Sequence, residues 1–360
     1  MKHLTLSFFD FNLPQQLIAQ NPLADKEEAK LLIVNQNIIA DKQIKDLVDL
    51  ISPLDLLIFN NTKVIPARLI AKKGEVTIEL TLHHQINHDK WLAFAKKSKR
   101  INPGDILQIA EDFYGTIVEK LEGGEVKIYF HDAQGKIIAK ENFYNNLEKY
   151  GYLPLPPYIK RQNINTEADK TNYQSIFAAI EGAVASPTAS LHFTSSLMQR
   201  IKEKGINTAF VTLHVGAGTF LPVKNEDISQ HKIHKEYGEL SQDTVNAIIN
   251  TKNKGGNVIA VGTTAMRVLE YSAQSSNGNE PFLIRSLKEF KGEIDLFILP
   301  GFEFKVVDAL ITNFHLPKST LFMLTCAFCG LNTMQKAYKH AIQKQYRFFS
   351  YGDCCFLNKT

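Results

Sequence analysis

The chain has 360 residues, of which 44% are hydrophobic and 22% are charged, so it can bury a large core and is too apolar for intrinsic disorder. Its 41 lysines and arginines outnumber its 37 aspartates and glutamates by only four, which permits an anionic partner without indicating one. Four cysteines are too few for a disulfide framework, and no signal peptide or membrane-spanning run is recognisable. We expect a soluble cytoplasmic protein with no membrane contact.

Short and almost continuously apolar runs predict strands that helices cover on both faces. These runs span residues 30–34, 55–59, 208–213, 257–261 and 294–299. Amphipathic helices are predicted over 194–204 with Thr194 as N-cap, over 241–255 with Ser241 as N-cap, and over about 319–345. The alternation of strand and helix predicts an α/β layered architecture.

The segment 68–150 has a different pattern. Its apolar residues alternate with period two or form short runs bounded by turns, at 75–82, 91–95, 105–109, 115–118 and 126–130. Strands at such spacing predict a small antiparallel β-barrel. Because α/β texture lies on both sides, we predict one discontinuous α/β domain, residues 1–67 and 151–360, interrupted by an inserted barrel domain, residues 68–150.

Polar and histidine residues follow the predicted α/β strands, at the edge where open sheets of this class bind ligands. Asn60, Asn61 and Lys63 follow one strand and could hold a phosphate or carboxylate, or could form an ordinary turn. His192 precedes a helix N-terminus, which favours an anion. Its pKa in the free state suits a general base, although a lone histidine is more often structural.

Glycines and hydroxyls follow two further strands. His214 ends a strand and precedes Gly216 and Gly218, which let the backbone approach a ligand closely. A dinucleotide fingerprint is excluded because position 221 is leucine. Thr263 and Thr264 open a helix that carries Arg267 one turn later, an arrangement that binds a carboxylate or simply caps the helix.

The remaining candidates lie near the C-terminus and on the barrel. Asp308, Asn313 and His315 belong to the densest polar region, and Tyr351 follows two phenylalanines that could stack on bases or pack in the core. The one concentrated basic cluster is Lys96, Lys97, Lys99 and Arg100, which with Arg68 could follow a nucleic-acid backbone or remain solvated. His231 and His234 stand three apart, but no third metal ligand accompanies them at a recognised spacing, so we expect no metal.

Taken in order, these strings resemble the S-adenosylmethionine:tRNA ribosyltransferase-isomerase family of queuosine biosynthesis over nearly the whole chain. The matching segments are FNNTKVIPARL (59–69), GYLPLPPYI (151–159), PTASLHF (187–193), FVTLHVGAGTF (210–220), VGTT (261–264) with Arg267, PGF (300–302) with Val307 and Asp308, TNFHLP (312–317) and FFSYGD (348–353). One departure is Ser190, where the family usually has glycine.

The resemblance implies an α/β domain with an inserted barrel, and an enzyme that transfers the ribosyl part of S-adenosylmethionine to 7-aminomethyl-7-deazaguanine at the tRNA wobble position. The ribosyl group rearranges to give epoxyqueuosine, and adenine and methionine leave. S-adenosylmethionine is then a co-substrate, no prosthetic group is needed, and the partner is the anticodon arm of tRNA. We expect a monomer without a stable protein partner.

Roles follow from the positions of residues within the matching motifs. Protons must move at neutral pH, so His192, His214 and His315 are the hypothesised acid and base set, with Asp308 as an orienter or base. The expected S-adenosylmethionine contacts are Gly216, Gly218, Thr263, Thr264 and Arg267. The expected tRNA or substrate contacts are Asn60, Asn61, Lys63, Arg68, Lys96, Lys97, Lys99, Arg100, Asn313 and Tyr351. Two alternatives stay open: a non-catalytic tRNA-binding protein, and a metal-dependent hydrolase using His231 and His234.

Overall fold

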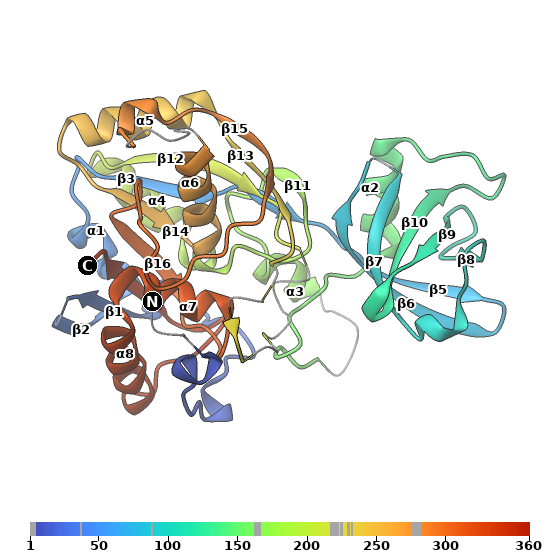
Figure 1. The fold of residues 1–360 in the computed structure, drawn as a ribbon, viewed down its shortest axis with the longest axis horizontal. Helices are drawn as coiled ribbons and strands as arrows, with labels where there is room; N and C mark the ends of the chain where they lie inside the picture. Colours follow the sequence, from blue (N-terminus) through green and yellow to red (C-terminus); the bar gives the residue numbers. More distant parts are fainter. Residues whose placement is uncertain are drawn as a thin grey trace.

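The structure, a computed structural model, describes residues 5–36, 38–87, 89–161, 167–216, 223, 226–228, 231, 233–275 and 282–360. An α/β domain and a β-barrel stand apart and are joined by two chain segments (Figure 1). Among the described residues, no helix combines the length and apolarity that crossing a bilayer requires.

A nine-stranded mixed sheet forms the centre of the α/β domain within the described residues. In spatial order its strands are β15 (Phe290–Ile294), β13 (Glu236–Leu240), β12 (Asn207–Leu213), β3 (Leu56–Asn60), β14 (Val258–Val261), β16 (Ala309–Asn313), β17 (Cys354–Asn358), β1 (Lys30–Asn35) and β2 (Ile38–Gln43). The four neighbours β12, β3, β14 and β16 are mutually parallel. Their carboxyl ends therefore meet at one edge, which we call the carboxyl edge.

Helices cover both faces of this sheet. They are α1 (Leu47–Leu50), α4 (Ser195–Glu203), α5 (Gln242–Asn253), α6 (Thr263–Ser275), α7 (Thr320–Cys329) and α8 (Leu331–Gln343). Side chains of β3 alternate between the two cores: Leu56 and Ile58 pack with α5 to α8, while Leu57 and Phe59 pack with α1 and α4. A strand buried on both faces has to be apolar throughout, which is why 55–59 reads as a continuous apolar run.

Helix caps were predicted well, and one strand was not. Thr194 and Ser241 each accept a backbone N–H at the start of α4 and α5, so both predicted caps are confirmed. The predicted strand 294–299 is wrong, because only Ile294 pairs, in β15, and the rest packs against the core as irregular chain. The predicted helix over 319–345 is two helices, since Gly330 turns the chain with φ of 84° between α7 and α8.

The inserted domain is a closed antiparallel barrel, so the predicted fold class is confirmed. Around the barrel the strands run β10 (Glu125–His131), β7 (Lys90–Lys96), β6 (Val76–Gln85), β5 (Arg68–Lys73), β8 (Ile106–Gln108) and β9 (Tyr114–Lys120). Helix α2 (Lys140–Tyr150) adds Phe143 and Leu147 to the same core as Trp91. The period-two pattern of β7 arises because every second side chain points into this core.

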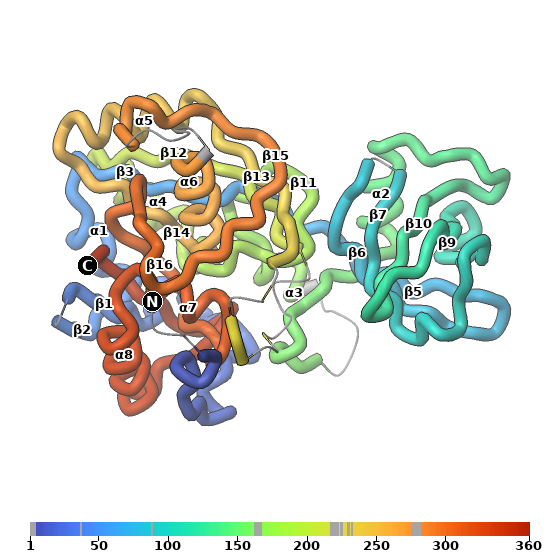
Figure 2. The backbone as a smooth tube through the Cα atoms, viewed as in Figure 1, coloured from blue at the N-terminus to red at the C-terminus, as the bar shows by residue number. Residues whose placement is uncertain are grey.

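Two chain segments cross between the domains side by side (Figure 2). Arg68 and Tyr152 exchange both backbone hydrogen bonds, at 3.0 and 2.8 Å. A Cβ on Gly151 would lie 2.1 Å from the Pro66 carbonyl oxygen, so only glycine allows this close crossing. Beside it, β4 (Thr62–Val64) pairs in parallel with β11 (Ile180–Ala183), and α3 (Glu167–Asn172) follows the proline-rich connector.

Candidate active site

A pocket opens at the carboxyl edge of the sheet, where the chain leaves β14 and β16. Three helical N-termini border it: α6 through Thr263, α7 through Ser319, and the 3-10 helix η7 (Thr188–His192) through Thr188. Its other lining residues are Tyr158, Tyr173, Ala185, Ser186, Pro187, Ala189, Val215, Gly262, Thr264, Arg267, Thr312, Asn313, Phe314, His315, Leu316, Leu321, Phe349 and Ser350. Unpaired N–H groups at helix N-termini give such a pocket a positive potential, which favours an anionic group.

Arg267 supplies the charge of the pocket. Its side chain comes from the second turn of α6 and is only 7% exposed. One guanidinium nitrogen, Nη1, pairs with Glu236 of β13, whereas Nε and Nη2 are buried and make no hydrogen bond to the part of the chain that the structure describes. A buried N–H without a partner is costly, so this guanidinium is suited to an incoming carboxylate.

Two hydroxyl groups of the pocket are, like the Arg267 nitrogens, buried without a hydrogen-bond partner among the described residues. Thr264 Oγ1 and Ser186 Oγ are buried and lack a hydrogen-bond partner among the described residues, and both side chains line the pocket. Thr263 begins α6 directly after Gly262, whose φ of 92° makes the sharp turn from strand to helix. The predicted set Thr263, Thr264 and Arg267 therefore lies together in one pocket.

Gly216 is connected to Arg267 through one carboxylate. The Gly216 backbone N–H donates to Glu236 Oε1 at 2.9 Å, and the other carboxylate oxygen pairs with Arg267. A Cβ on Gly216 would lie 3.1 Å from the carbonyl oxygen of His83 in the barrel. Gly216 thus lies where the loop after β12 meets the barrel, while Gly218 lies outside the described residues.

Two of the predicted histidines hydrogen-bond the end of β16: His315 contacts Thr312, and His192 contacts Asn313. His315 lines the pocket, and its Nε2 lies 2.9 Å from Thr312 Oγ1. Asn313 accepts from Thr188 Oγ1 at 2.8 Å and donates its amide N–H to His192 Nε2 at 3.3 Å. An amide NH₂ only donates, so the Nε2 of neutral His192 carries the lone pair. His192 is buried behind Asn313 and supports the pocket wall.

His214 follows β12, one residue before the pocket-lining Val215. Its Nδ1 lies 2.8 Å from Thr62 Oγ1, and its ring stacks on Tyr237 with ring centroids 5.5 Å apart. Its backbone N–H donates to the Tyr237 carbonyl at 2.9 Å. His214 therefore lies in the chain directly before the pocket-lining Val215 and two residues before Gly216, which meets the barrel.

Burial keeps all three predicted histidines neutral. Desolvation lowers the pKa of His192 to about 4, with Lys26 and Arg347 adding to the effect. Desolvation also lowers the pKa of His214 to about 4, against the opposing charge of Glu239, and that of His315 to about 3. At pH 7 each imidazole is in the form that accepts a proton.

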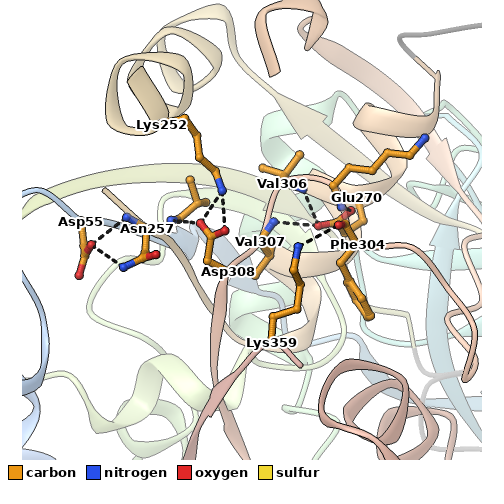
Figure 3. Close-up of polar contacts among 11 residues, drawn as sticks. Asp55, Lys252, Asn257, Glu270, Phe304, Val306, Val307, Asp308 and Lys359 are labelled. Atoms are coloured by element: carbon orange, nitrogen blue, oxygen red, sulfur yellow. Dashed lines mark hydrogen bonds and ion pairs between the residues drawn. The ribbon is translucent and has the colours of Figure 1, made fainter. Parts of the chain in front are cut away.

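Asp308 lies at the opposite end of β16 from the pocket. Its carboxylate accepts from Lys252 Nζ at 2.6 and 2.5 Å and from the Val258 backbone N–H at 2.7 Å (Figure 3). Nearby, Glu270 accepts the backbone N–H groups of Lys305, Val306 and Val307. These contacts attach the start of β16 to α5, α6 and β14, so the position of Asp308 supports a structural role and not the predicted catalytic one.

Asn60 and Asn61 also have structural partners. Asn60 is fully buried, and its amide bonds both the N–H and the C=O of Leu213, at 3.1 and 3.0 Å, which ties β3 to β12. Asn61 accepts from Thr212 Oγ1 at 2.7 Å. Neither residue is among those that line the pocket, so their predicted contact with substrate stays a prediction.

The six predicted phosphate-binding cations divide into two groups. Lys63, Arg68 and Lys96 each face a carboxylate at 2.9 Å: Glu181 for the first, Glu79 for the other two. The Glu181 hydrogen bond raises the pKa of Lys63. The remaining three cations, Lys97, Lys99 and Arg100, are exposed around the 3-10 helix η5 (Ser98–Arg100) and form no ion pair with the described residues. This exposed group is the part of the basic cluster that is open to a polyanion.

Tyr351 lies just behind the pocket wall. It is 4% exposed and contacts Tyr173, whose ring centroid is 6.0 Å away and which lines the pocket.

His231 packs against Phe297, at 5.6 Å between ring centroids. Within the described ranges, no group of three or more histidine, cysteine or acidic side chains is placed to hold a metal ion.

Comparison with known proteins identifies the family of this chain. The family model described as "Queuosine biosynthesis protein" matches residues 6–357. The chain belongs to this family. It is 45% identical over 355 residues to the S-adenosylmethionine:tRNA ribosyltransferase-isomerase of Rhodospirillum rubrum, covering 99% of this chain and 98% of the relative. It is 44% identical over 369 residues to the enzyme of the same name from Rickettsia bellii, covering 99% of both chains.

A solved structure extends the likeness to the fold. The crystal structure of an S-adenosylmethionine tRNA ribosyltransferase from Thermotoga maritima is 30% identical, with a TM-score of 0.54 over 97% of this chain and 99% of that one. The predicted family and the predicted class, a transferase of queuosine biosynthesis, are thereby confirmed. Membership of this family favours a transferase over both alternatives, the non-catalytic tRNA-binding protein and the metal-dependent hydrolase.

Several residues of the pocket escaped prediction. Glu236, which pairs with Arg267 without being one of the lining residues, and the lining residues Ser186 and Tyr173 come from segments outside the matching motifs, whereas Tyr158 belongs to the matching segment 151–159. Thr188 belongs to a matching segment, and its position at the start of η7 was the available signal. The others approach the pocket only through pairings between distant parts of the chain, which a single sequence does not reveal.

Proposed function

We propose that the pocket binds S-adenosylmethionine and that the protein transfers and isomerises its ribosyl group onto 7-aminomethyl-7-deazaguanine at the tRNA wobble position. The product is epoxyqueuosine in tRNA, and adenine and methionine leave. One observation carries this proposal: Arg267 lines the pocket with two guanidinium nitrogens, Nε and Nη2, that have no partner among the described residues, and three helix N-termini and His315 line the same pocket. Family membership supports the same activity.

The methionine carboxylate is the group that fits Arg267. A carboxylate accepting from Nε and Nη2 would satisfy both buried N–H groups with charge-assisted hydrogen bonds. Thr263 and Thr264, at the N-terminus of α6, add hydroxyl and backbone donors to the same anion. The aromatic rings of Tyr158, Tyr173 and Phe349 line the same pocket and offer apolar surface to the adenine.

The proton transfers fit neutral histidines. The sulfonium acidifies the ribose C5′ proton, which a neutral imidazole can accept, and the electron pair left on C5′ expels adenine. The imidazolium then holds the proton that the adenine nitrogen needs as it leaves, so one histidine serves as base and acid in turn. His315 lines the pocket and is our candidate for this residue. Methionine leaves as a neutral thioether and needs no acid.

The tRNA amine requires a second base. The aminomethyl nitrogen loses a proton as it attacks the sugar, and our candidate for its base is His214, which directly precedes the pocket-lining Val215 and stands two residues before Gly216, where the chain meets the barrel. Lys97, Lys99 and Arg100 offer the barrel's exposed positive charge to tRNA phosphates. His192 acts indirectly, by supporting Asn313.

Incubation with S-adenosylmethionine and tRNA carrying 7-aminomethyl-7-deazaguanine tests the proposal directly. We expect adenine release that depends on both substrates, and a protein that releases no more adenine than a protein-free control would refute it. Replacing His315 or His214 with alanine should lower turnover by roughly 10² if each transfers a proton. Titration with S-adenosylmethionine alone separates this enzyme from a non-catalytic tRNA-binding protein, which would not bind it.

A further inference from the structure

The environment of His214 selects one of its two neutral tautomers. Thr62 is fully buried in β4, and its Oγ1 lies 2.8 Å from His214 Nδ1 and 3.4 Å from the Ile180 carbonyl oxygen. The Ile180 carbonyl can only accept, and it lies within reach of the Thr62 hydroxyl proton. When the hydroxyl donates to Ile180, Thr62 Oγ1 accepts from His214 Nδ1–H, and the lone pair of the neutral ring is then on Nε2.

Gly182 of β11 gives the ring its space. A Cβ at this position would lie 2.8 Å from Nε2 and 2.9 Å from each of its two ring neighbours, so it would press on the face of the imidazole. The backbone of Gly182 also has φ of 145°, which side chains other than glycine rarely adopt. Tyr237 of β13 stacks on the same ring with 19° between the planes.

Three separate strands therefore hold one imidazole. Nε2 makes no hydrogen bond to the described residues, and it is not among their fully buried unpaired nitrogens, so the described residues do not enclose it completely. We propose that Thr62 and Gly182 are positioning residues for the reaction: Thr62 holds His214 in the Nδ1–H tautomer, and Gly182 keeps the ring aimed so that Nε2 accepts a proton from substrate. This inference rests on the proposed function of His214 as a base.

The arrangement matters because the ring is neutral at working pH. Burial lowers the pKa of His214 to about 4, so the ring at pH 7 exists as one of two neutral tautomers, and only one has its lone pair on Nε2. Two charged groups, Lys291 and Glu239, hydrogen-bond Tyr237, and the charge of Glu239, which accepts from Tyr237 Oη at 3.2 Å, opposes the lowering. Fixing the second nitrogen of a histidine is a general way to set which nitrogen reacts.

The test measures both the tautomer of His214 and the rate of adenine release. ¹⁵N-labelled histidine spectra of the full-length protein report which nitrogen of His214 is protonated, and the His214→Gln variant identifies its signals. We expect the Nδ1–H form in the wild type and in Thr62→Ser, and the Nε2–H form in Thr62→Val, with adenine release lowered roughly tenfold or more only in the valine variant. Thr251→Val, which removes a buried hydroxyl from α5 far from this ring, is the matched control.

Each outcome decides the inference. An Nε2–H ring in the wild type, or an Nδ1–H ring in Thr62→Val, would overturn the role of Thr62 whatever the rates are. A wild-type rate in His214→Gln would instead refute the proposed function of His214, and the inference with it, without bearing on S-adenosylmethionine binding. If Thr62→Val does not fold, Gly182→Ala provides the second variant: unchanged His214 signals and an unchanged rate there would overturn the positioning claim.

Discussion

Replacing Arg267 with lysine separates the two tasks of this side chain. Nη1 pairs with the buried carboxylate of Glu236, while Nε and Nη2 of this pocket-lining residue are buried and have no hydrogen-bond partner among the described residues. Lysine keeps a cation for Glu236 but has a single nitrogen, so it loses the N–H groups we assign to the methionine carboxylate. Truncation to alanine is a poorer test, because removing the ion-pair partner of the buried Glu236 would destabilise the protein by about 3–5 kcal/mol.

The expected loss follows from the hydrogen bonds removed. A hydrogen bond to a charged group contributes about 1.5–3 kcal/mol, so losing one raises the Kd for S-adenosylmethionine by a factor of about 10–150, and losing two raises it further. Calorimetric titration of the wild type and of Arg267→Lys measures this change. The same titration with 5′-methylthioadenosine is the control, since this ligand shares the nucleoside and lacks the carboxylate.

Two results would count against the reasoning. If Arg267→Lys binds S-adenosylmethionine within twofold of the wild type, Arg267 does not hold the carboxylate. If the variant loses affinity for 5′-methylthioadenosine to the same extent, the substitution has disturbed the pocket as a whole. Only a selective loss for the carboxylate-bearing ligand supports the assignment.

Three further predictions concern other parts of the chain. The triple variant Lys97→Ala, Lys99→Ala and Arg100→Ala should reduce the slope of log tRNA affinity against log salt by about 2–3, measured by filter binding across salt concentrations. Asp308→Asn should lower the free energy of unfolding by about 1–3 kcal/mol in denaturant titrations and leave kcat within twofold. Because the folded state holds His192 at a pKa of about 4 against an ordinary 6.5, the unfolded chain binds its proton first as pH falls. The unfolding free energy should therefore drop between pH 6.5 and 4, by about 3 kcal/mol from this residue alone.

Matched controls make these outcomes decisive. Lys336→Ala, Lys339→Ala and Lys344→Ala remove the same charge from exposed positions on or beside α8, and an equal change in slope there would show that net charge alone is responsible. A hundredfold loss of kcat in a stable Asp308→Asn protein would restore its predicted catalytic role. A wild-type pH profile of stability in His192→Gln would contradict the assignment of the acid-sensitive step to this histidine.

Local patterns predicted most of the regular elements. A strand such as β3 is covered on both faces and must be apolar throughout, and the caps Thr194 and Ser241 satisfy backbone donors within three residues of themselves. These causes are local, so the sequence shows them. The apolar run 294–299 was wrongly predicted as a strand because a buried segment is apolar whether or not it pairs with another strand.

Candidate residues were harder to sort because their roles depend on distant partners. Asp308 and His315 lie in adjacent motifs, yet β16 runs between them and places the carboxylate at one edge of the sheet and the imidazole at the other. Lys63 and Arg68 looked like phosphate ligands until Glu181 and Glu79 proved to face them. The sequence shows which side chains are charged, but only the tertiary structure shows which of them form ion pairs.

The sequence by itself determined the fold class, the helix caps, the family and the set of residue types able to bind an anion or move a proton near neutral pH. Tertiary structure alone decided which of them meet. It joined Arg267 to Glu236 while leaving two guanidinium nitrogens without a partner among the described residues, and it placed Thr62 and Gly182 around His214. The physical reason is that protonation and hydrogen-bond capacity belong to a side chain, whereas desolvation and partners come from strands brought together across the sheet.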